Sequence, residues 1–183
     1  MKINNIVILG GGTSGWMTAL AILRNFSDIN VSLVESNKIG IIGVGEATIP
    51  SVTNFLKDTL NLDEDDWMEF TDSTYKCAIR FRDFKDFNQP EEDWAYHHFW
   101  SRSEFEESIF HFLLKKSKDQ NIPVDEFYSS YFIAHHMCKE NKWGKTDIKH
   151  AHHIDSHKLG QYIKSKCIGY DNFNHIEGTV ERV

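Results

Sequence analysis

The chain has 183 residues, of which 40% are hydrophobic and 26% charged, values typical of a single soluble globular domain. Its formal net charge of −7 disfavours binding to a nucleic-acid backbone. The three cysteines form no C-x-x-C pair, which favours a reducing compartment, and no apolar segment is long enough to span a membrane. We therefore expect a cytoplasmic protein with no nucleic-acid or membrane partner.

The first 35 residues predict a strand, a helix and a second strand. Residues 3–9 end in a nearly continuous apolar run, which is typical of a parallel strand buried on both faces. Residues 16–26 carry an apolar stripe with helical spacing, and residues 30–35 form a second apolar segment. This order is the βαβ unit of an α/β fold.

The turn between the first strand and the helix has the pattern G-x-G-x-x-G. Gly10 permits a tight turn, Gly12 lets the backbone approach a pyrophosphate, and Gly15 lets the helix pack closely on the strand. Thr13 and Ser14 lie within the pattern, next to a helix N-terminus whose free N–H groups favour phosphate. These five residues are candidate cofactor-binding residues.

Glu35 ends the second strand roughly 20 residues after the glycine pattern, where an acidic side chain accepts a hydrogen bond from a ribose 2′-OH. Its negative charge would repel a 2′-phosphate, which disfavours NADP. The combined pattern predicts a Rossmann-type dinucleotide site and leaves FAD and NAD open. The alternative is a glycine-rich turn that binds no ligand.

The remaining elements follow from turn residues and from the spacing of apolar residues. In chain order, they are a glycine-rich loop at 40–46, a helix at 50–60, a short helix through Trp67 and Phe70 that begins at the acidic run 63–66, a strand at 77–84, an irregular aromatic segment at 87–100, a helix at 104–118, an ambiguous segment at 125–143, a helix at 155–166 and a final strand at 175–183.

Two motifs resemble the flavin-dependent tryptophan halogenase family: GGGTSGWM at residues 10–17 and GVGEATIP at residues 43–50. Weaker similarity extends the resemblance over nearly the whole chain, at 67–68, 75–81, 96–99, 153–157 and 177–183. The resemblance implies a Rossmann-type FAD-binding fold of the flavin monooxygenase kind, incomplete at its C-terminus. Residues 1–183 would form the N-terminal part of an FAD-binding halogenase domain.

The resemblance also implies a reaction. Reduced FAD from a separate flavin reductase, oxygen and a halide ion would give hypohalous acid, which chlorinates or brominates tryptophan or another electron-rich arene. The matching lysine is Lys76, which would activate hypohalous acid either as a hydrogen-bond donor or as an uncharged nucleophile that forms a haloamine. The residues leave both roles open, and a solvated lysine at a strand edge is the alternative.

The resemblance assigns further cofactor contacts. Gly45, Glu46 and Ala47 would lie against the flavin, where glycine allows close backbone approach, and Glu46 and Ala47 would help to bind halide or couple the two sites. The alternative is a flexible strand-to-helix loop. Val180 matches the position whose backbone holds the adenine side of FAD, and is otherwise a core strand residue.

The match to the family is incomplete, because the signature Trp-x-Trp-x-Ile-Pro is absent. The carboxylate that partners the lysine would lie beyond Val183. We expect no halogenase turnover from the isolated chain, which would be either a truncated gene product or one piece of a split enzyme whose partner is a complementary C-terminal chain. The alternatives are a non-catalytic flavin-binding fragment that needs a partner chain, and another FAD or NAD oxidoreductase in which Lys76 is incidental.

Ten histidines raise the question of a metal site. His153 and His157 are spaced so that one helix face could carry both, whereas His135 and His136 are adjacent. The sequence has no H-E-x-x-H motif and no carboxylate at a convincing ligand spacing, so no metal site is predicted.

Overall fold

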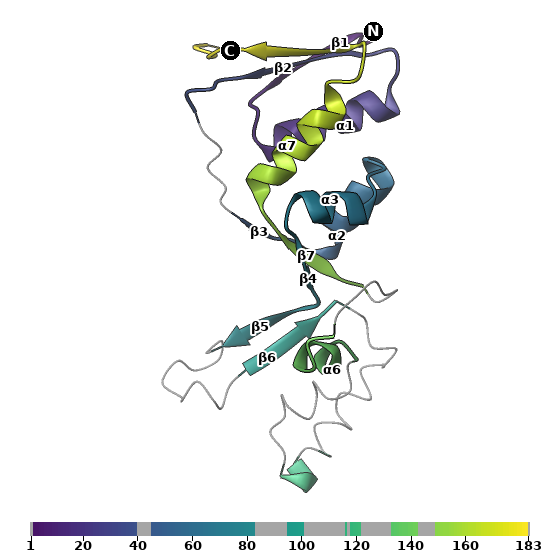
Figure 1. Cartoon of the computed structure of the whole chain (residues 1–183), viewed down its shortest axis with the longest axis vertical. Helices are drawn as coiled ribbons and strands as arrows, with labels where there is room; N and C mark the ends of the chain where they lie inside the picture. Colours follow the sequence, from purple (N-terminus) through teal and green to yellow (C-terminus); the bar gives the residue numbers. More distant parts are fainter. Residues whose placement is uncertain are drawn as a thin grey trace. The chain divides into compact units, whose positions relative to one another are not determined.

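The computed structural model describes residues 2–39, 45–82, 95–100, 116, 118–121, 133–142 and 149–182. The chain divides into two compact units (Figure 1). The first consists of Met1–Thr74 and His152–Val183, and the second of Tyr75–Ala151. The first unit contains the predicted βαβ segment.

A parallel three-stranded sheet organises the first unit, with the order β1 (Asn5–Leu9), β2 (Asn30–Glu35), β8 (Phe173–Glu177). Helix α1 (Thr13–Asn25) connects β1 to β2, which confirms the predicted βαβ unit; the helix begins three residues earlier than the sequence pattern indicates. Because β8 pairs with β2, the carboxyl ends of all three strands lie at one edge of the sheet.

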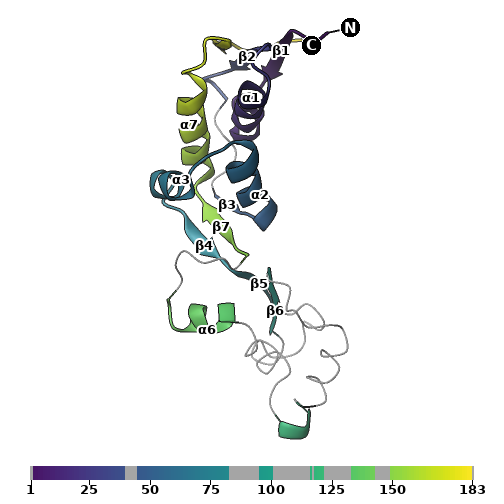
Figure 2. The ribbon, with the colours of Figure 1, turned by 90° about the vertical axis from the view of Figure 1, so that its right-hand side faces the viewer.

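The hydrophobic core lies between this sheet and the two helices α1 and α7 (Ser156–Cys167), which run side by side (Figures 1 and 2). Trp16 is only 2% exposed and packs against Phe173 of β8, with ring centroids 5.9 Å apart. Other buried side chains of this layer are those of Ala19, Leu20, Leu23, Val31, Leu33, Leu159, Tyr162, Ile163 and Cys167.

The opposite face of the sheet is exposed, so the expectation that β1 is buried on both faces is wrong. Val7 is 61% exposed and Leu9 is 49% exposed, and Ile176 of β8 is 40% exposed on the same face. The reason is that α1 and α7 both pack on the face that carries Ile8 and Leu33.

The helix predicted at 50–60 is present but changes type. It begins as α2 (Pro50–Asn54) and continues as a π-helical turn, η1 (Phe55–Thr59), in which the Leu60 N–H donates to the Phe55 carbonyl at 3.0 Å. The short helix α3 (Glu64–Phe70) is confirmed. The Asp63 carboxylate caps it by accepting from the N–H groups of two residues in the first turn.

His153 and His157, whose spacing would suit one helix face, do not lie on the same helix. His153 belongs to strand β7 (Ala151–Ile154), which pairs with the short strand β3 (Glu46–Ala47) of the second glycine loop. Asp155 then caps α7 by accepting from the Lys158 N–H at 2.9 Å, and His157 lies within the helix. The cap therefore separates the two histidines.

The second unit contains most of the remaining described elements: β4 (Thr74–Lys76), which begins at the last residue of the first unit, β5 (Ala78–Arg82), β6 (Ala95–Phe99) and α6 (Ile133–Lys139). The strand predicted at 77–84 is confirmed as β5 but begins one residue later, at Ala78, and residues 83–84 lie outside the described residues. The prediction that 87–100 is irregular is wrong for β6, because residues 95–99 pair antiparallel with β5, and residues 87–94 lie outside the described residues. Of the helix predicted at 104–118, only Lys116 and Lys118 are described, and both are helical.

Helix α6 supplies one helical element within the ambiguous segment 125–143. Within the described ranges, no helix combines the length and the apolar character that crossing a bilayer requires.

Candidate functional site

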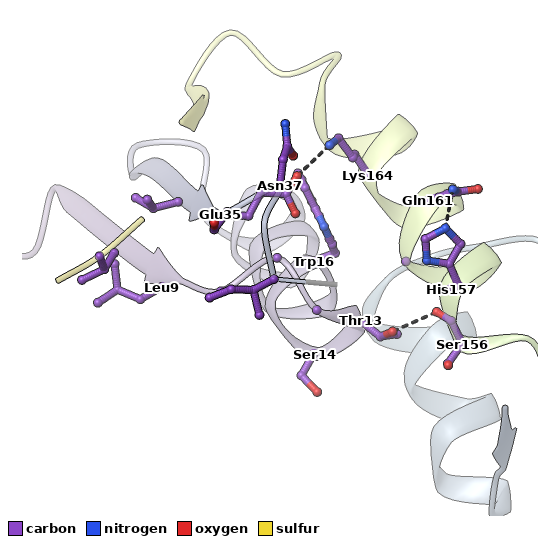
Figure 3. A pocket seen from close by; sticks show the side chains of 18 of the residues that line it. Leu9, Thr13, Ser14, Trp16, Glu35, Asn37, Ser156, His157, Gln161 and Lys164 are labelled. Atoms are coloured by element: carbon purple, nitrogen blue, oxygen red, sulfur yellow. Dashed lines mark hydrogen bonds and ion pairs between the residues drawn. The ribbon is translucent and has the colours of Figure 1, made fainter. Parts of the chain in front are cut away.

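A groove of about 870 Å³ lies at the carboxyl ends of the parallel strands in the first unit (Figure 3). Ligands of open α/β folds bind at this edge of the sheet. The groove is lined by the first glycine turn, the start of α1, the end of β2, one face of α7 and the segment after β8. The candidate residues Gly10, Gly12, Thr13, Ser14 and Glu35 therefore meet in one place, whereas Gly15 does not line the groove.

The glycines of the first turn have three different roles. Gly10 has a φ of +114°, a conformation that L side chains rarely adopt. No atom lies within 4 Å of a Cβ built on Gly12, so the backbone there is open to a ligand. A Cβ on Gly15 would collide with the Gly10 carbonyl oxygen, so the close packing of α1 on the turn requires glycine.

The N-terminus of α1 faces the groove without a side-chain cap. Its N-cap residue is Gly12, and the first turn contains no acidic side chain. The free N–H groups and the positive end of the helix dipole are thus left to an anion. Thr13 donates its hydroxyl to the Ser156 carbonyl at 2.9 Å and so joins α1 to α7, whereas Ser14 is exposed and lines the groove (Figure 3).

Glu35 is at the end of β2 as predicted, but its carboxylate is already paired. Oε1 accepts from Lys164 Nζ at 2.7 Å and from His175 Nε2 at 2.8 Å (Figure 3 shows the lysine bond). Burial by itself would raise the pKa of the Glu35 carboxyl, but the bonds and charges of Lys164 and then His175 outweigh it and hold the pKa below 4.5. The predicted exclusion of NADP depends on repulsion between the Glu35 carboxylate and a 2′-phosphate. The positive charge of Lys164 offsets this repulsion.

The second glycine loop reaches the same groove. Glu46 lines it, and Gly45, Glu46 and Ala47 also line a smaller hollow of about 430 Å³ beside β7. All three residues are exposed. Glu46 is held in register with Ile154 by the pairing of β3 and β7. Residues 40–44, which include Gly43 of the resemblance, lie outside the described residues.

Val180 lines the groove, but it is not a core strand residue. The final strand predicted at 175–183 runs instead from Phe173 to Glu177, and Val180 is 43% exposed. The Gly178 N–H still donates to the Glu35 carbonyl at 2.8 Å, and the Thr179 hydroxyl is 3.0 Å from that of Ser36. Strand β8 does not continue toward Val180, because its neighbour β2 ends at Glu35.

Lys76 is the last residue of β4 and belongs to the second unit. Its side chain is half-buried, and burial lowers the pKa of its amine from the ordinary value of 10.5. Nζ lies 5.3 Å from the centre of the Trp100 ring, a cation–π distance. A lowered pKa raises the fraction of uncharged amine at a given pH.

Several residues of the site were not predicted from the sequence. Lys164, which lines the groove, and His175, which bonds Glu35, lie 129 and 140 positions from Glu35, so local patterns do not connect them. His157 and Gln161 are hydrogen-bonded to each other on the groove face of α7. Their spacing of four residues places them on one helix face, so the sequence could have indicated that they lie together. Gly11 was also missed, although a Cβ there would overlap the Glu35 carboxylate.

Comparison with known proteins assigns the chain to a family. The sequence profile described as tryptophan halogenase matches residues 5–183. The chain belongs to the tryptophan halogenase family. This confirms the resemblance carried by the two glycine motifs.

Two curated members illustrate the relationship. The tryptophan 6-halogenase SttH of Streptomyces toxytricini is 30% identical, over 98% of this chain and 38% of its own length. The tryptophan 7-halogenase RebH of Lentzea aerocolonigenes is 28% identical, over 100% of this chain and 37% of its own length. This halogenase-family chain therefore spans little more than a third of either relative.

Solved structures agree with the fold. Xcc4156, a flavin-dependent halogenase from Xanthomonas campestris, matches 100% of this chain and 36% of its own, with a TM-score of 0.84 and 29% identity. The tryptophan 6-halogenase Tar14 matches 98% of this chain with a TM-score of 0.79 and 27% identity. The predicted Rossmann-type α/β fold of a flavin-dependent halogenase is confirmed.

Proposed function

We propose that residues 1–183 are the N-terminal, FAD-binding part of a halogenase domain that chlorinates or brominates an electron-rich arene such as tryptophan. The observation that carries this proposal is the single groove lined by both glycine motifs, from the Gly10 turn through Glu35 to Glu46. A dinucleotide lying along such a groove would place its flavin and its adenine at opposite ends, with the pyrophosphate between them.

The residues present fit FAD. The open backbone at Gly12 and the uncapped N-terminus of α1, with Thr13 and Ser14, would bind the pyrophosphate. The Glu35 carboxylate would accept a hydrogen bond from a ribose hydroxyl, and the backbone at Val180 would hold the adenine. When bound and reduced by a separate flavin reductase, FAD supplies the electrons that activate oxygen for halide oxidation.

The second glycine loop would hold the ring end of the cofactor. Gly45 and Ala47 have small side chains and exposed backbone, so a flat ring system can approach them closely. The carboxylate of Glu46 would help to organise the halide or couple the two sites, as the family resemblance implies.

Lys76 would act on hypohalous acid. As an ammonium it donates a hydrogen bond to the acid's oxygen; as an amine it is a nucleophile toward the halogen. The pKa of Lys76, lowered by burial, supports a larger share of the uncharged form.

We also propose that further halogenase sequence, on the same polypeptide or on a complementary chain, covers the open face of the sheet. The chain spans 38% of SttH, and the open face exposes Val7, Leu9 and Ile176. Exposed apolar faces of this kind are sites of association.

A reconstitution tests the catalytic part of the proposal. The chain is combined with the polypeptide that completes it, a flavin reductase, FAD, oxygen, chloride or bromide, and tryptophan. We expect halogenated product, which Lys76→Ala abolishes and Lys139→Ala, an exposed position on α6, leaves unchanged. Equal product from the Lys76→Ala enzyme would refute the role of Lys76.

A further inference from the structure

Three side chains from three elements meet at the end of β2: Glu35 from β2, Lys164 from α7 and His175 from β8. Glu35 and Lys164 line the groove. The side chains of Lys164 and His175 both donate to the same oxygen of Glu35. Lys164 Nζ is 2.7 Å and His175 Nε2 is 2.8 Å from Glu35 Oε1. These two hydrogen bonds hold Oε1 in place, and the planar geometry of the carboxylate then restricts where Oε2 can lie.

The second oxygen of the same carboxylate points elsewhere. Glu35 Oε2 is the atom closest to a Cβ built on Gly11, so it lies against the glycine turn that lines the groove. A side chain at position 11 would displace it. The run of three glycines thus leaves room for a carboxylate oxygen at the mouth of the site.

The two donors are themselves held in place. Lys164 Nζ lies 5.1 Å from the centre of the Trp16 ring, and the His175 ring centre lies 5.4 Å from it. Trp16 is 2% exposed and belongs to the core. The donors therefore rest on a rigid support, and the orientation they impose on Glu35 is set by the fold.

We propose that Lys164 and His175 are positioning residues that hold Oε1 of Glu35 so that Oε2 accepts a ribose hydroxyl of the bound dinucleotide. The preference of the groove for ribose over deoxyribose then depends on α7 and β8 as well as on Glu35. This inference rests on the proposed FAD-binding function and deepens it. A donor acting through Glu35 affects recognition of one hydroxyl, whereas a lysine acting on phosphate affects every nucleotide alike.

Calorimetric titration of the purified chain with ADP and with 2′-deoxy-ADP separates these two effects, because ADP carries the adenosine end of FAD. We expect wild type to bind ADP about tenfold more tightly than 2′-deoxy-ADP, the size of one hydrogen bond to a charged group. Lys164→Met is expected to bring this ratio close to one. Lys164→Arg keeps a donor at the position and is expected to restore part of the preference.

Lys166→Met is the matched control, since Lys166 is on the same helix but lies over the Tyr162 ring instead of lining the groove. It is expected to keep the wild-type ratio. His175→Gln provides a second test through the other donor, and circular dichroism checks that each variant is folded.

An unchanged ratio in folded Lys164→Met and His175→Gln overturns the inference. Equal weakening of both nucleotides by Lys164→Met also overturns it and assigns the lysine to phosphate. A wild-type chain that binds neither ADP nor FAD contradicts the proposed function itself, and the inference with it.

Discussion

The carbonyl oxygen of Gly10 occupies the space that a Cβ on Gly15 would need. The contact joins the turn after β1 to the third residue of α1, so it fixes where the helix begins relative to the strand. Since the opposing atom belongs to the backbone, the fold cannot relieve a larger side chain by a rotamer change.

Gly15→Ala is therefore expected to lower the free energy of unfolding by about 2 kcal/mol, the usual cost of overpacking. Gly169→Ala is the matched control, because no atom lies within 4 Å of a Cβ at that position; its effect should stay within about 0.5 kcal/mol. Urea denaturation measures both. If Gly15→Ala were as stable as Gly169→Ala, the close contact with the Gly10 carbonyl would not restrict the residue at position 15.

Gly12→Val separates binding from stability. The space around Gly12 is open, and its φ of −69° suits any L residue, so the chain should fold normally. The added side chain would stand where the phosphates approach the backbone, and we expect FAD affinity to fall at least tenfold, or ~1.4 kcal/mol. The FAD affinity of Gly12→Ala should lie between those of wild type and Gly12→Val. Wild-type FAD affinity in folded Gly12→Val would place the phosphates elsewhere.

Glu35 gives the first unit a pH-dependent stability. Because its pKa in the folded chain lies below the ordinary 4.5, the carboxylate stabilises the fold above pH 4.5. That contribution is lost as the pH falls through the lower, folded pKa. The free energy of unfolding of wild type and Glu35→Gln, measured in urea at a series of pH values, should differ above pH 4.5 and converge below the folded pKa. A difference that grows on acidification would contradict the pairing.

Lys76 should react with amine reagents at lower pH in the folded chain than in the unfolded chain. Burial lowers the pKa of its amine from 10.5, and the uncharged amine is the reactive form. Competitive acetylation followed by peptide mass analysis gives the midpoint for Lys76 in buffer and in urea. Equal midpoints in the two conditions would show that burial does not affect this amine.

The parts of the fold that were predictable are those that local spacing determines. The glycine turn and the apolar stripes specify β1, α1 and β2 within one continuous stretch, and Asp63 and Asp155 each mark the start of a helix. These features depend on neighbours in the sequence, so propensity and capping are sufficient.

The missed features depend on distant residues. β6 is a strand because it pairs with β5, and its own residues, AYHHF, show no clear alternation. The donors to Glu35 arrive from α7 and β8 after more than 100 intervening residues. Val7 is exposed because both helices cover the other face of the sheet. An apolar run in one strand does not indicate which of its two faces the helices will cover.

Equilibrium binding of FAD to the purified chain, followed by flavin fluorescence, tests most directly whether the groove beside Gly10–Glu35 is the cofactor site. We expect saturable one-to-one binding that ADP displaces and that Gly12→Val weakens at least tenfold, or ~1.4 kcal/mol. Absence of saturable binding, or binding that Gly12→Val and ADP leave unchanged, would contradict it.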